Sequence, residues 1–597
     1  MFLHTYLEAR GSLPRRTALA LCAVVPVSAA PAALAGPVAS PAPRVPQSLG
    51  TTVRVSVTAS GAQSTGPTQP ELRGVALSED GRFVAFTSRA ADLVPGDGNG
   101  LEDVFLRDTL LGTTVRVSGA PGGADGNGFC RTCDVSDDGR FVVFSSAASN
   151  LTPGDSNGNR DVFLRDVALG TTTLVSRALG GGYGDGISRW PSVSGDGAVV
   201  VFQSAATDLV PGDTNAIDDV FAYDVAGGTL RALSRGPGGA FGNGESSMPH
   251  VSRDGAWAAF ESTATNLGPA DTSVRADVYL AELATGQVVR VEGPNGELDA
   301  RSARPRISAD GRFVAFESQA TNLVLGGNVN GTHIARWDRL TGALDVVTRD
   351  LAGNVSGGVS GDACVSSAGE LVAFRSFESD LVTGDTNGRE DVFVRHVSEG
   401  WTERVSVTRD GAQIVGWPSR APALSGDGRF AAFTTGSEDV VQGDDNGAID
   451  VFRRDRVFGE GVLAVEYCAS TVNSSGAAAV TVAVGTPLLS AQDLTLGTVG
   501  LPPNQFGFYL TSPAVDLVPG FGGSAGVLCV GAPIVRLDAF ILNSGSLGRV
   551  DLPLPFAQVP PAAAFTVGTR WNFQYWFRDS AGGALSNTSS AIAVVWR

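Results

Sequence analysis

Short stretches in which apolar and polar residues alternate recur along the chain, and Gly, Asp and Asn fill the turns between them. RFVAFTS is typical of one set, DVFLRD of a second and TTVRVS of a third. Alternation with a period of two predicts half-buried β-strands, whereas a helix would place its apolar residues three and four apart. The chain is therefore predicted to be all-β.

These stretches form a repeat with seven copies. The TTVRVS stretch or a weaker copy of it starts at 51, 113, 171, 229, 287, 343 and 401, so the copies are 56 to 62 residues apart. An S-x-D-G motif precedes most RFVAF stretches, and its Asp-Gly pair predicts a tight hairpin turn. Each copy supplies four strands, and a period of this length suits the blade of a β-propeller.

The order of the strands predicts how the repeat ends. Seven sets of the first three strands are present, and the last ends near Arg456, but fourth strands follow only six of them. The remaining fourth strand, TTVRVSVT at 51–58, precedes all the others. We expect it to complete the last blade and close a seven-bladed propeller over 51–458, which removes free sheet edges.

The pattern S-x-DGR-FVAF…DVFLRD…TG resembles the TolB-type, WD-repeat-like propeller family of exported bacterial proteins. The resemblance covers roughly 51–458. It implies a propeller fold and an activity that consists mainly of binding proteins or ligands. Propellers carry many unrelated functions, so the resemblance implies no catalytic residue.

The N-terminal segment predicts export. Arg10, Arg15 and Arg16 precede an apolar run that ends in an A-x-A cleavage pattern at 33–35. We interpret 1–35 as a signal peptide and 36–50 as a Pro/Ala-rich linker. The Arg15-Arg16 pair leaves the twin-arginine route open beside ordinary secretion. No later segment is predicted to span a membrane, so a periplasmic, cell-surface or extracellular protein is expected.

Charge and cysteine content narrow the classes of function. The formal net charge is −18 and the chain has no lysine, so all 43 basic residues are arginine. This balance argues against a nucleic-acid partner. In an oxidising compartment we expect structural disulfides, between Cys130 and Cys133 and between Cys468 and Cys529, with Cys364 left over.

The motif D-x-N-G-x-x-D fills the loop between the second and third strands and is the candidate metal site. Five copies are complete in their three polar residues: Asp97, Asn99 and Asp103; Asp155, Asn157 and Asp161; Asp213, Asn215 and Asp219; Asp385, Asn387 and Asp391; Asp444, Asn446 and Asp450. Oxygen ligands at alternate positions of a short loop are typical of calcium sites. Calcium is therefore a candidate ligand, although no cofactor is required.

A structural interpretation of the same loops stays open. Asx-turns at the first two positions, with the last Asp anchoring the third strand, would explain the motif without a metal. The fourth copy reads Asp271, Ser273 and Asp277. The fifth reads Gly327, Val329 and His333 at unchanged length, which favours a ligand slightly because the polar groups are dispensable for folding.

Catalytic patterns are weak. The G-x-S-x-G at 522–526 lies in a Gly-rich β segment without the helix that a nucleophile elbow needs. His250, His333 and His396 fall in three different copies and have no ligand spacing. The aromatic residues Trp190, Phe241 and Trp417 on variable loops would be able to stack on a sugar.

The last part, 459–597, is predicted to be a separate β-sandwich of seven or eight strands. Alternation in WNFQYWFRD places Trp571, Phe573, Tyr575 and Phe577 on one face, which we expect to be core. This part resembles a C-terminal module of large exported bacterial proteins. The resemblance implies sorting, attachment or oligomerisation.

The sequence favours an exported, non-enzymatic binding or scaffold protein that uses the loop-rich acidic face of a propeller to bind a protein or glycan partner. Two alternatives stay open. One is a carbohydrate-active enzyme or lectin-like glycan-binding propeller on the same face, and the other is a structural surface-layer component.

Overall fold

The computed structural model describes 51–66, 74–268, 271, 274–324, 330–409 and 411–456, and after that 465–468, 479–484, 495–499, 501–513, 515–519, 527–530, 534–537, 540–544, 549–554, 570–578 and 586–595. The expected signal peptide and linker lie outside these residues. Within them, no helix has the length and apolar character needed to cross a membrane. Helical structure consists of the short 3-10 turns η1 (Pro121–Gly123) and η2 (Pro237–Gly239).

The described part of 51–456 is nearly all strand and turn, folded into seven four-stranded antiparallel sheets. The first strands are β2 (Val75–Leu77), β6 (Cys130–Val135), β10 (Ser188–Val193), β14 (Ser246–Val251), β18 (Ser302–Ile307), β22 (Ser360–Val365) and β26 (Arg420–Leu424). The second strands are β3 (Phe83–Ser88), β7 (Phe141–Ser146), β11 (Val199–Ser204), β15 (Trp257–Ser262), β19 (Phe313–Ser318), β23 (Leu371–Ser376) and β27 (Phe430–Thr435).

The third strands are β4 (Asp103–Asp108), β8 (Asp161–Asp166), β12 (Asp219–Asp224), β16 (Asp277–Glu282), β20 (His333–Asp338), β24 (Asp391–His396) and β28 (Asp450–Asp455). The fourth strands are β5 (Thr113–Arg116), β9 (Thr171–Leu174), β13 (Thr229–Ala232), β17 (Val288–Arg290), β21 (Leu344–Val346), β25 (Trp401–Arg404) and β1 (Thr51–Arg54). Such repeated four-stranded sheets are those of a β-propeller-like repeat fold.

The N-terminal strand belongs to the last sheet. β1 pairs antiparallel with β28, with Thr51 opposite Asp455 and Arg54 opposite Phe452. The sheet order is therefore β1-β28-β27-β26.

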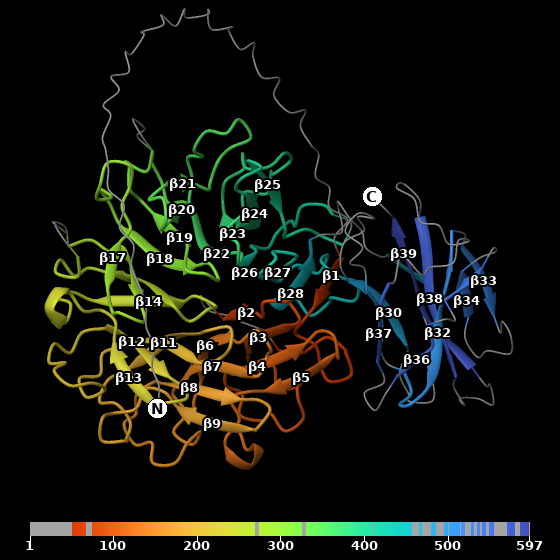
Figure 1. The fold of residues 1–597 in the computed structure, drawn as a ribbon, viewed down its shortest axis with the longest axis horizontal. Helices are drawn as coiled ribbons and strands as arrows, with labels where there is room; N and C mark the ends of the chain where they lie inside the picture. Colours follow the sequence, from red (N-terminus) through yellow and green to blue (C-terminus); the bar gives the residue numbers. More distant parts are fainter. Residues whose placement is uncertain are drawn as a thin grey trace, which may run out of the picture. The chain divides into compact units, whose positions relative to one another are not determined.

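Consecutive sheets pack face to face through buried apolar side chains. One cluster joins Val162 of the second sheet to Val200 and Phe202 of the third. Another joins Val84 of the first sheet to Val451 of the seventh. In Figure 1 the first strands lie toward a common centre and the fourth strands lie outward.

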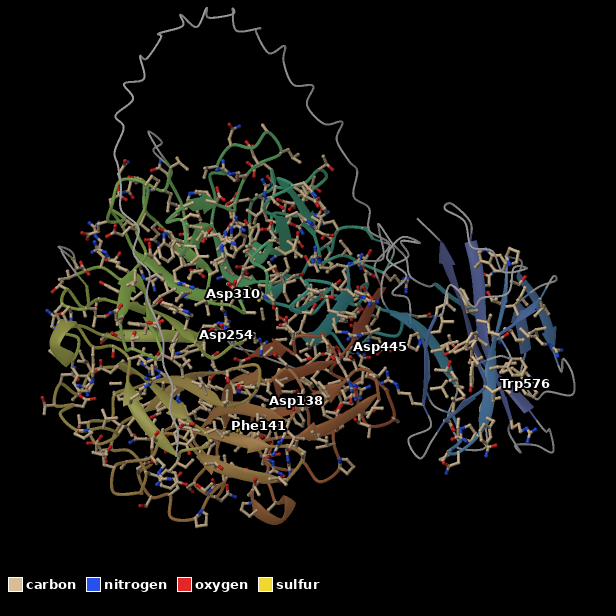
Figure 2. All side chains as sticks on the ribbon, in the orientation of Figure 1. Asp138, Phe141, Asp254, Asp310, Asp445 and Trp576 are labelled. Carbon is tan, nitrogen blue, oxygen red and sulfur yellow. The ribbon has the colours of Figure 1, made fainter. Side chains whose placement is uncertain are left out.

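The sheets have two chemically different ends. We call the end with the Asp-Gly turns and the connections between third and fourth strands the turn end, and the opposite end the loop end. At the turn end, Ser136 Oγ donates to Asp138 Oδ1 at 2.7 Å and accepts the Phe141 N–H at 2.9 Å. Figure 2 labels Asp138 and Phe141 of this turn and the equivalent Asp254 and Asp310. The S-x-D-G motif thus folds its own hairpin.

In six of the seven turns the glycine allows the neighbouring sheet to pack closely against it. A Cβ at Gly197 (φ +74°) would lie 2.1 Å from the ring of Phe141 in the preceding sheet. The same relation joins Gly81 (φ +68°) of the first sheet to Phe430 of the seventh, at 2.4 Å. Residues with a side chain fit neither the conformation nor the space.

Backbone hydrogen bonds also link the turns of neighbouring sheets. The N–H groups of Asp137, Gly195 and Ser367 each donate to a carbonyl in the next turn, at 2.8 Å. Gly426 N–H of the seventh sheet donates to the Glu79 carbonyl of the first, also at 2.8 Å.

A cavity of about 30 Å³ lies where first strands meet. Its lining residues come from five sheets and include Val75, Met248, Arg304, Asp362 and Ala421. The first strands β2, β14, β18, β22 and β26 therefore all border this cavity.

The C-terminal part contains further antiparallel sheets. Their strands are β29 (Val465–Cys468), β30 (Val480–Val484), β31 (Thr495–Val499), β32 (Phe506–Ser512), β33 (Val515–Pro519), β34 (Val527–Val530), β35 (Val535–Arg536), β36 (Leu542–Asn543), β37 (Val550–Pro553), β38 (Arg570–Arg578) and β39 (Ser586–Val595). The sheet built on β29-β39-β38-β32-β35 and the sheet β30-β31-β37 share one apolar cluster. Trp571, Phe573, Tyr575 and Phe577 are all buried in it, which confirms the core face predicted for β38.

Candidate functional site

Each acidic loop is held by a hydrogen-bond network centred on its asparagine. In the first sheet, Asn99 Oδ1 accepts the Leu101 N–H at 2.8 Å, which is an Asx-turn. Asn99 Nδ2 donates to Asp103 Oδ2 at 2.9 Å and to the Gly126 carbonyl at 3.1 Å. The asparagine therefore ties the loop to the start of β4 and to the loop that leads into the next sheet.

The same network recurs in the other complete copies. The side-chain amide of Asn157 donates to Asp161 at 3.1 Å, that of Asn215 to Asp219 at 3.1 Å and that of Asn387 to Asp391 at 2.8 Å. In the seventh sheet, Asn446 Nδ2 donates to the Ser64 carbonyl at 2.9 Å.

A serine hydroxyl two residues beyond the fourth strand anchors the last aspartate of the motif. Ser118 Oγ donates to Asp103 Oδ1 at 2.5 Å and accepts the Val104 N–H at 3.0 Å. Ser176, Ser234, Ser406 and Ser56 make the same pair of contacts in their sheets. In the fifth sheet His333 stands at the aspartate position and contacts Thr348 Oγ1 at 3.2 Å, so the anchoring contact survives the change of residue.

In four sheets an arginine of the fourth strand lies beside the first aspartate of the acidic loop. Arg116 lies 3.5 Å from Asp97, Arg54 lies 3.5 Å from Asp444, and Arg404 lies 3.7 Å from Asp385. Arg290 has the equivalent position in the fourth sheet, 3.6 Å from Asp271. In the second and third sheets Leu174 and Ala232 stand at this position. A guanidinium thus supplies the positive charge of these four loops.

Burial governs the titration of the loop carboxyls. It raises the pKa of Asp161 to about 7 and that of Asp219 to about 6, against hydrogen bonds that lower both values. It likewise raises the pKa of Asp450 and Asp97 to about 6. Asp161, Asp219 and Asp450 are fully buried and Asp97 is partly buried, so the charged form is poorly solvated.

The oxygen atoms of one group of carboxylates are as closely spaced as the ligands of a metal site. Oxygen atoms of Asp271, Asp277 and Glu297 lie within 4.8 Å of one another. Among the described residues, the buried Asp277 Oδ2 has no hydrogen-bond partner. Arg290 Nη1, however, lies 3.6 Å from both Asp271 and Glu297. The guanidinium already neutralises the group.

The complete loops fit calcium poorly. A calcium ion needs several oxygen ligands, but each asparagine presents amide hydrogens to the strand aspartate or to a carbonyl and uses its oxygen for the Asx-turn. The arginine occupies the cationic position in most of the loops. The geometry is that of the structural interpretation offered by the sequence, and calcium stays a prediction for experiment.

The loop end of the first strands carries an irregularity that the sequence does not reveal. Six of these strands contain a residue with positive φ, between 42° and 55°, where their pairing to the second strand shifts register: Thr132, Trp190, Met248, Arg304, Asp362 and Ala421. Such β-bulges redirect side chains. Four of the six line the cavity of about 30 Å³ between the first strands.

Charged side chains surround these bulges. We call them the mouth: Arg131, Arg160, Arg189, Asp218, Glu261, Arg301, Arg304, Glu317, Asp362, Arg375, Glu390 and Arg420. Ion pairs join Arg189 to Asp218 at 2.7 Å, Arg304 to Glu317 at 3.1 Å and Arg375 to Asp362 at 2.5 Å. A cavity of about 190 Å³ opens beside Arg301, Arg304 and Arg375 and is also lined by Gln319, Thr332 and Ser360.

The predicted disulfide between Cys130 and Cys133 is wrong. Both cysteines are buried free thiols on β6. A strand rises about 3.3 Å per residue, so three steps keep the Cα atoms beyond the roughly 7 Å that a disulfide tolerates. Cys130 Sγ donates instead to Ser146 Oγ at 3.2 Å and Cys133 Sγ to the Gly74 carbonyl at 3.8 Å. The side chains of Cys468 and Cys529 lie outside the described residues.

The other candidate residues lie apart. His250, His333 and His396 belong to β14, β20 and β24. Trp190, Phe241 and Trp417 fall in or just before three different sheets, and the guanidinium of Arg235 lies 4.0 Å from the Phe241 ring centre. The G-x-S-x-G segment lies outside the described residues.

No protein-family model matches the chain, and no curated protein matches its sequence. Solved structures do resemble it. A protein assigned as TolB from Agrobacterium tumefaciens aligns at 16% identity over 46% of this chain and 79% of its own, with a TM-score of 0.29. TolB from Acinetobacter baumannii aligns at 16% identity over 54% of this chain and 63% of its own, with a TM-score of 0.32. A prolyl endopeptidase structure aligns at 11% identity over 76% of this chain and 56% of its own, with a TM-score of 0.40.

Proposed function

We propose that the chain is an exported seven-bladed β-propeller, closed by its N-terminal strand, that binds a protein partner through its loop end. Closure is supported by three observations: the pairing of β1 with β28, the packing of Phe430 on Gly81, and the hydrogen bond from Gly426 to Glu79. Each repeats, across the ends of the chain, a contact that other sheets make.

The row of β-bulges at the mouth is the reason for placing the binding surface at the loop end. Left-handed conformations in residues other than glycine cost about 1–3 kcal/mol each and cluster at functional sites. The turn end has no such row in the described residues, and nearly all its hairpins repeat the same Ser–Asp contacts. The copies are alike at one end and differ at the other, as expected when a rigid scaffold presents a binding surface.

Binding rather than catalysis is supported by the histidines. His333 is fully buried and contacts Thr348 and the Asn330 carbonyl. His396 stacks on Trp401 with ring centres 3.7 Å apart and contacts Glu403 at 3.2 Å. Their contacts are structural, and we propose no catalytic role for them.

The remaining parts of the proposal rest on the sequence. Residues 1–35 direct export to the periplasm, the cell surface or the medium. The propeller occupies 51–458, and 459–597 form a separate module for attachment or sorting. No cofactor is required, because the acidic loops are held by their own side chains.

A lectin-like glycan-binding propeller is the second candidate. The observation that favours it is the cavity of about 190 Å³, whose amide, hydroxyl and guanidinium lining offers the hydrogen bonds that a sugar needs.

Site-specific photo-crosslinking in the cells that produce the protein tests the binding surface. Leu179, in the loop between β9 and β10, and Leu169, in the turn between β8 and β9, are 63% and 69% exposed. A photoreactive phenylalanine analogue at 179 should yield a discrete protein adduct, whereas the matched substitution at 169 should yield none. Adducts at 169 alone, or equally at both, would contradict the proposal.

A further inference from the structure

The arginines of the mouth are not equally compensated. Those with ion pairs include Arg189, Arg304, Arg375 and Arg420, each beside a carboxylate. Arg160 differs, because its side chain makes no hydrogen bond or ion pair with a described residue.

Arg160 lies where the second and third sheets meet. It directly precedes β8, and its carbonyl accepts the N–H of Ser188, the first residue of β10, at 2.8 Å. Arg131 on β6 and Arg189 on β10 occupy equivalent places on either side, opposite Ser145 and Gln203 of their second strands. Burial and these two neighbouring guanidiniums lower the pKa of Arg160.

Two exposed apolar side chains flank the three arginines. Phe129 and Ile187 directly precede β6 and β10, and each is 38% exposed. The guanidinium of Arg131 lies 5.1 Å from the centre of the Phe129 ring. We call these five residues, Phe129, Arg131, Arg160, Ile187 and Arg189, the notch.

We infer that the notch binds an acidic peptide segment of the partner protein, with a carboxylate against Arg160 and apolar side chains against Phe129 and Ile187. This inference rests on the proposed function. Arg189 is already paired with Asp218, whereas Arg160 has no carboxylate partner among the described residues, so an opposite charge brought by a ligand offsets the cost of holding these like charges together. The planar guanidinium matches a carboxylate through two parallel hydrogen bonds.

The apolar flanks favour a peptide over a saccharide. Interface centres are enriched in aromatic residues and arginine, which is the composition of the notch. The chain as a whole carries a net charge of −18, so attraction of an acidic segment has to be local. The notch supplies it.

Random-peptide display on the full secreted chain tests the inference. Peptides that carry Asp or Glu beside an apolar residue should be enriched. A synthetic copy should bind at least about tenfold more weakly to Arg160→Glu and to Arg160→Gln, because one partner of a desolvated charge pair is lost. The matched control is Arg177→Glu, which makes the same charge change at an exposed arginine in the loop after β9.

Four results would overturn the inference. Peptides that bind Arg160→Glu as well as the parent would leave a binding surface but remove the notch from it. A weakening shared equally by Arg177→Glu would reduce the effect to long-range charge. If tetragalacturonate binds instead, depends on Arg160, and no acidic peptide is enriched, the notch belongs to a glycan. Enrichment of no peptide on any variant would count against the proposed function as well. Circular dichroism of each variant must show the parent spectrum and melting curve.

Discussion

The ring of Phe430, in the last repeat, lies against Gly81 in the first, as the ring of Phe141 lies against Gly197 one sheet further along. The contact is the same although one pair is separated by most of the repeat region and the other by a single repeat. The seventh and first sheets therefore meet as ordinary neighbours do. The first prediction tests this relation, and the second tests the place of β1 in the seventh sheet.

Replacing Gly81 with alanine should destabilise the fold more than replacing Gly61. Both glycines have positive φ, +68° and +80°, so alanine costs about 1–2 kcal/mol of conformational strain at either position. Only at 81 does the new Cβ meet a ring, which adds about 1–3 kcal/mol. Urea denaturation of Gly81→Ala and Gly61→Ala measures the difference. Equal losses would mean that Phe430 does not lie against Gly81.

Ser56→Ala should cost as much stability as Ser118→Ala. Each hydroxyl donates to a buried strand aspartate and accepts a backbone N–H. Removing it leaves buried polar groups unsatisfied, at about 1–3 kcal/mol. Ser118 lies in a sheet that is continuous in sequence, whereas Ser56 follows β1. A neutral Ser56→Ala beside a destabilising Ser118→Ala would show that β1 does not sit on β28.

Calcium should leave the melting temperature of 36–597 unchanged relative to excess chelator. The asparagine amides are hydrogen-bonded within the loops, and in three of the five loops an arginine already supplies the positive charge. A metal bound only by the folded state at 100 times its dissociation constant would add about 2.7 kcal/mol per site. An upward shift of several degrees would therefore restore the calcium interpretation of the acidic loops.

Lowering the pH from about 7 to about 4 should stabilise the second sheet through Asp161. Burial raises the pKa of this carboxyl to about 7, while its ordinary value is 3.8. The folded state thus holds the proton more tightly than the unfolded state, so the free energy of unfolding falls as the pH rises through this window.

Asp161→Asn removes the titrating group and should flatten that part of the pH dependence. Denaturation at pH 4.5, 6 and 7.5 measures both proteins. The matched control is Asp138→Asn, at the turn end of the same sheet. An unchanged slope in Asp161→Asn would contradict the buried position of the carboxyl.

Cys130 and Cys133 should be reduced in the secreted protein and unreactive until it unfolds. Burial raises the pKa of the Cys130 thiol to about 12 and raises that of Cys133 as well, so the reactive thiolate is scarce. Mass spectrometry after alkylation should find neither residue modified under native conditions and both modified in urea. A linked pair that needs a reductant before it reacts would restore the predicted disulfide.

The sequence predicted the parts of the fold that each repeat encodes locally. The Asp-Gly turn at Asp138 and the core face of Trp571 follow from turn chemistry and from alternation, and both are present. The bulge at Trp190 could not be predicted, because a register shift between paired strands leaves no mark in residue type. The predicted disulfide was wrong because a C-x-x-C on an extended strand holds its two Cα atoms too far apart for a bond.

The site was predicted less well, since its contacts join segments distant in sequence. The link from Asp103 to Ser118 spans 15 residues, and the same spacing recurs in the second, third and sixth sheets. That constancy was the available signal for the anchoring hydroxyl. No sequence signal marks Arg160, because the equivalent positions of other copies include Asp218 and Glu390. Only the assembled sheets show that Arg160 lacks a carboxylate partner among the described residues.

The place of β1 in the last sheet has a consequence for biosynthesis. Ser56 and Asp450, which hydrogen-bond to each other, are 394 residues apart. β1, the first of these strands to be made, must stay unpaired until β28, the last strand of the seven sheets, has been made, and until the two pair β28 has no partner on its outer side. Closing so long a loop is slow. Until β1 pairs with β28, the nascent protein is therefore most exposed to proteases and to pairing with a second chain.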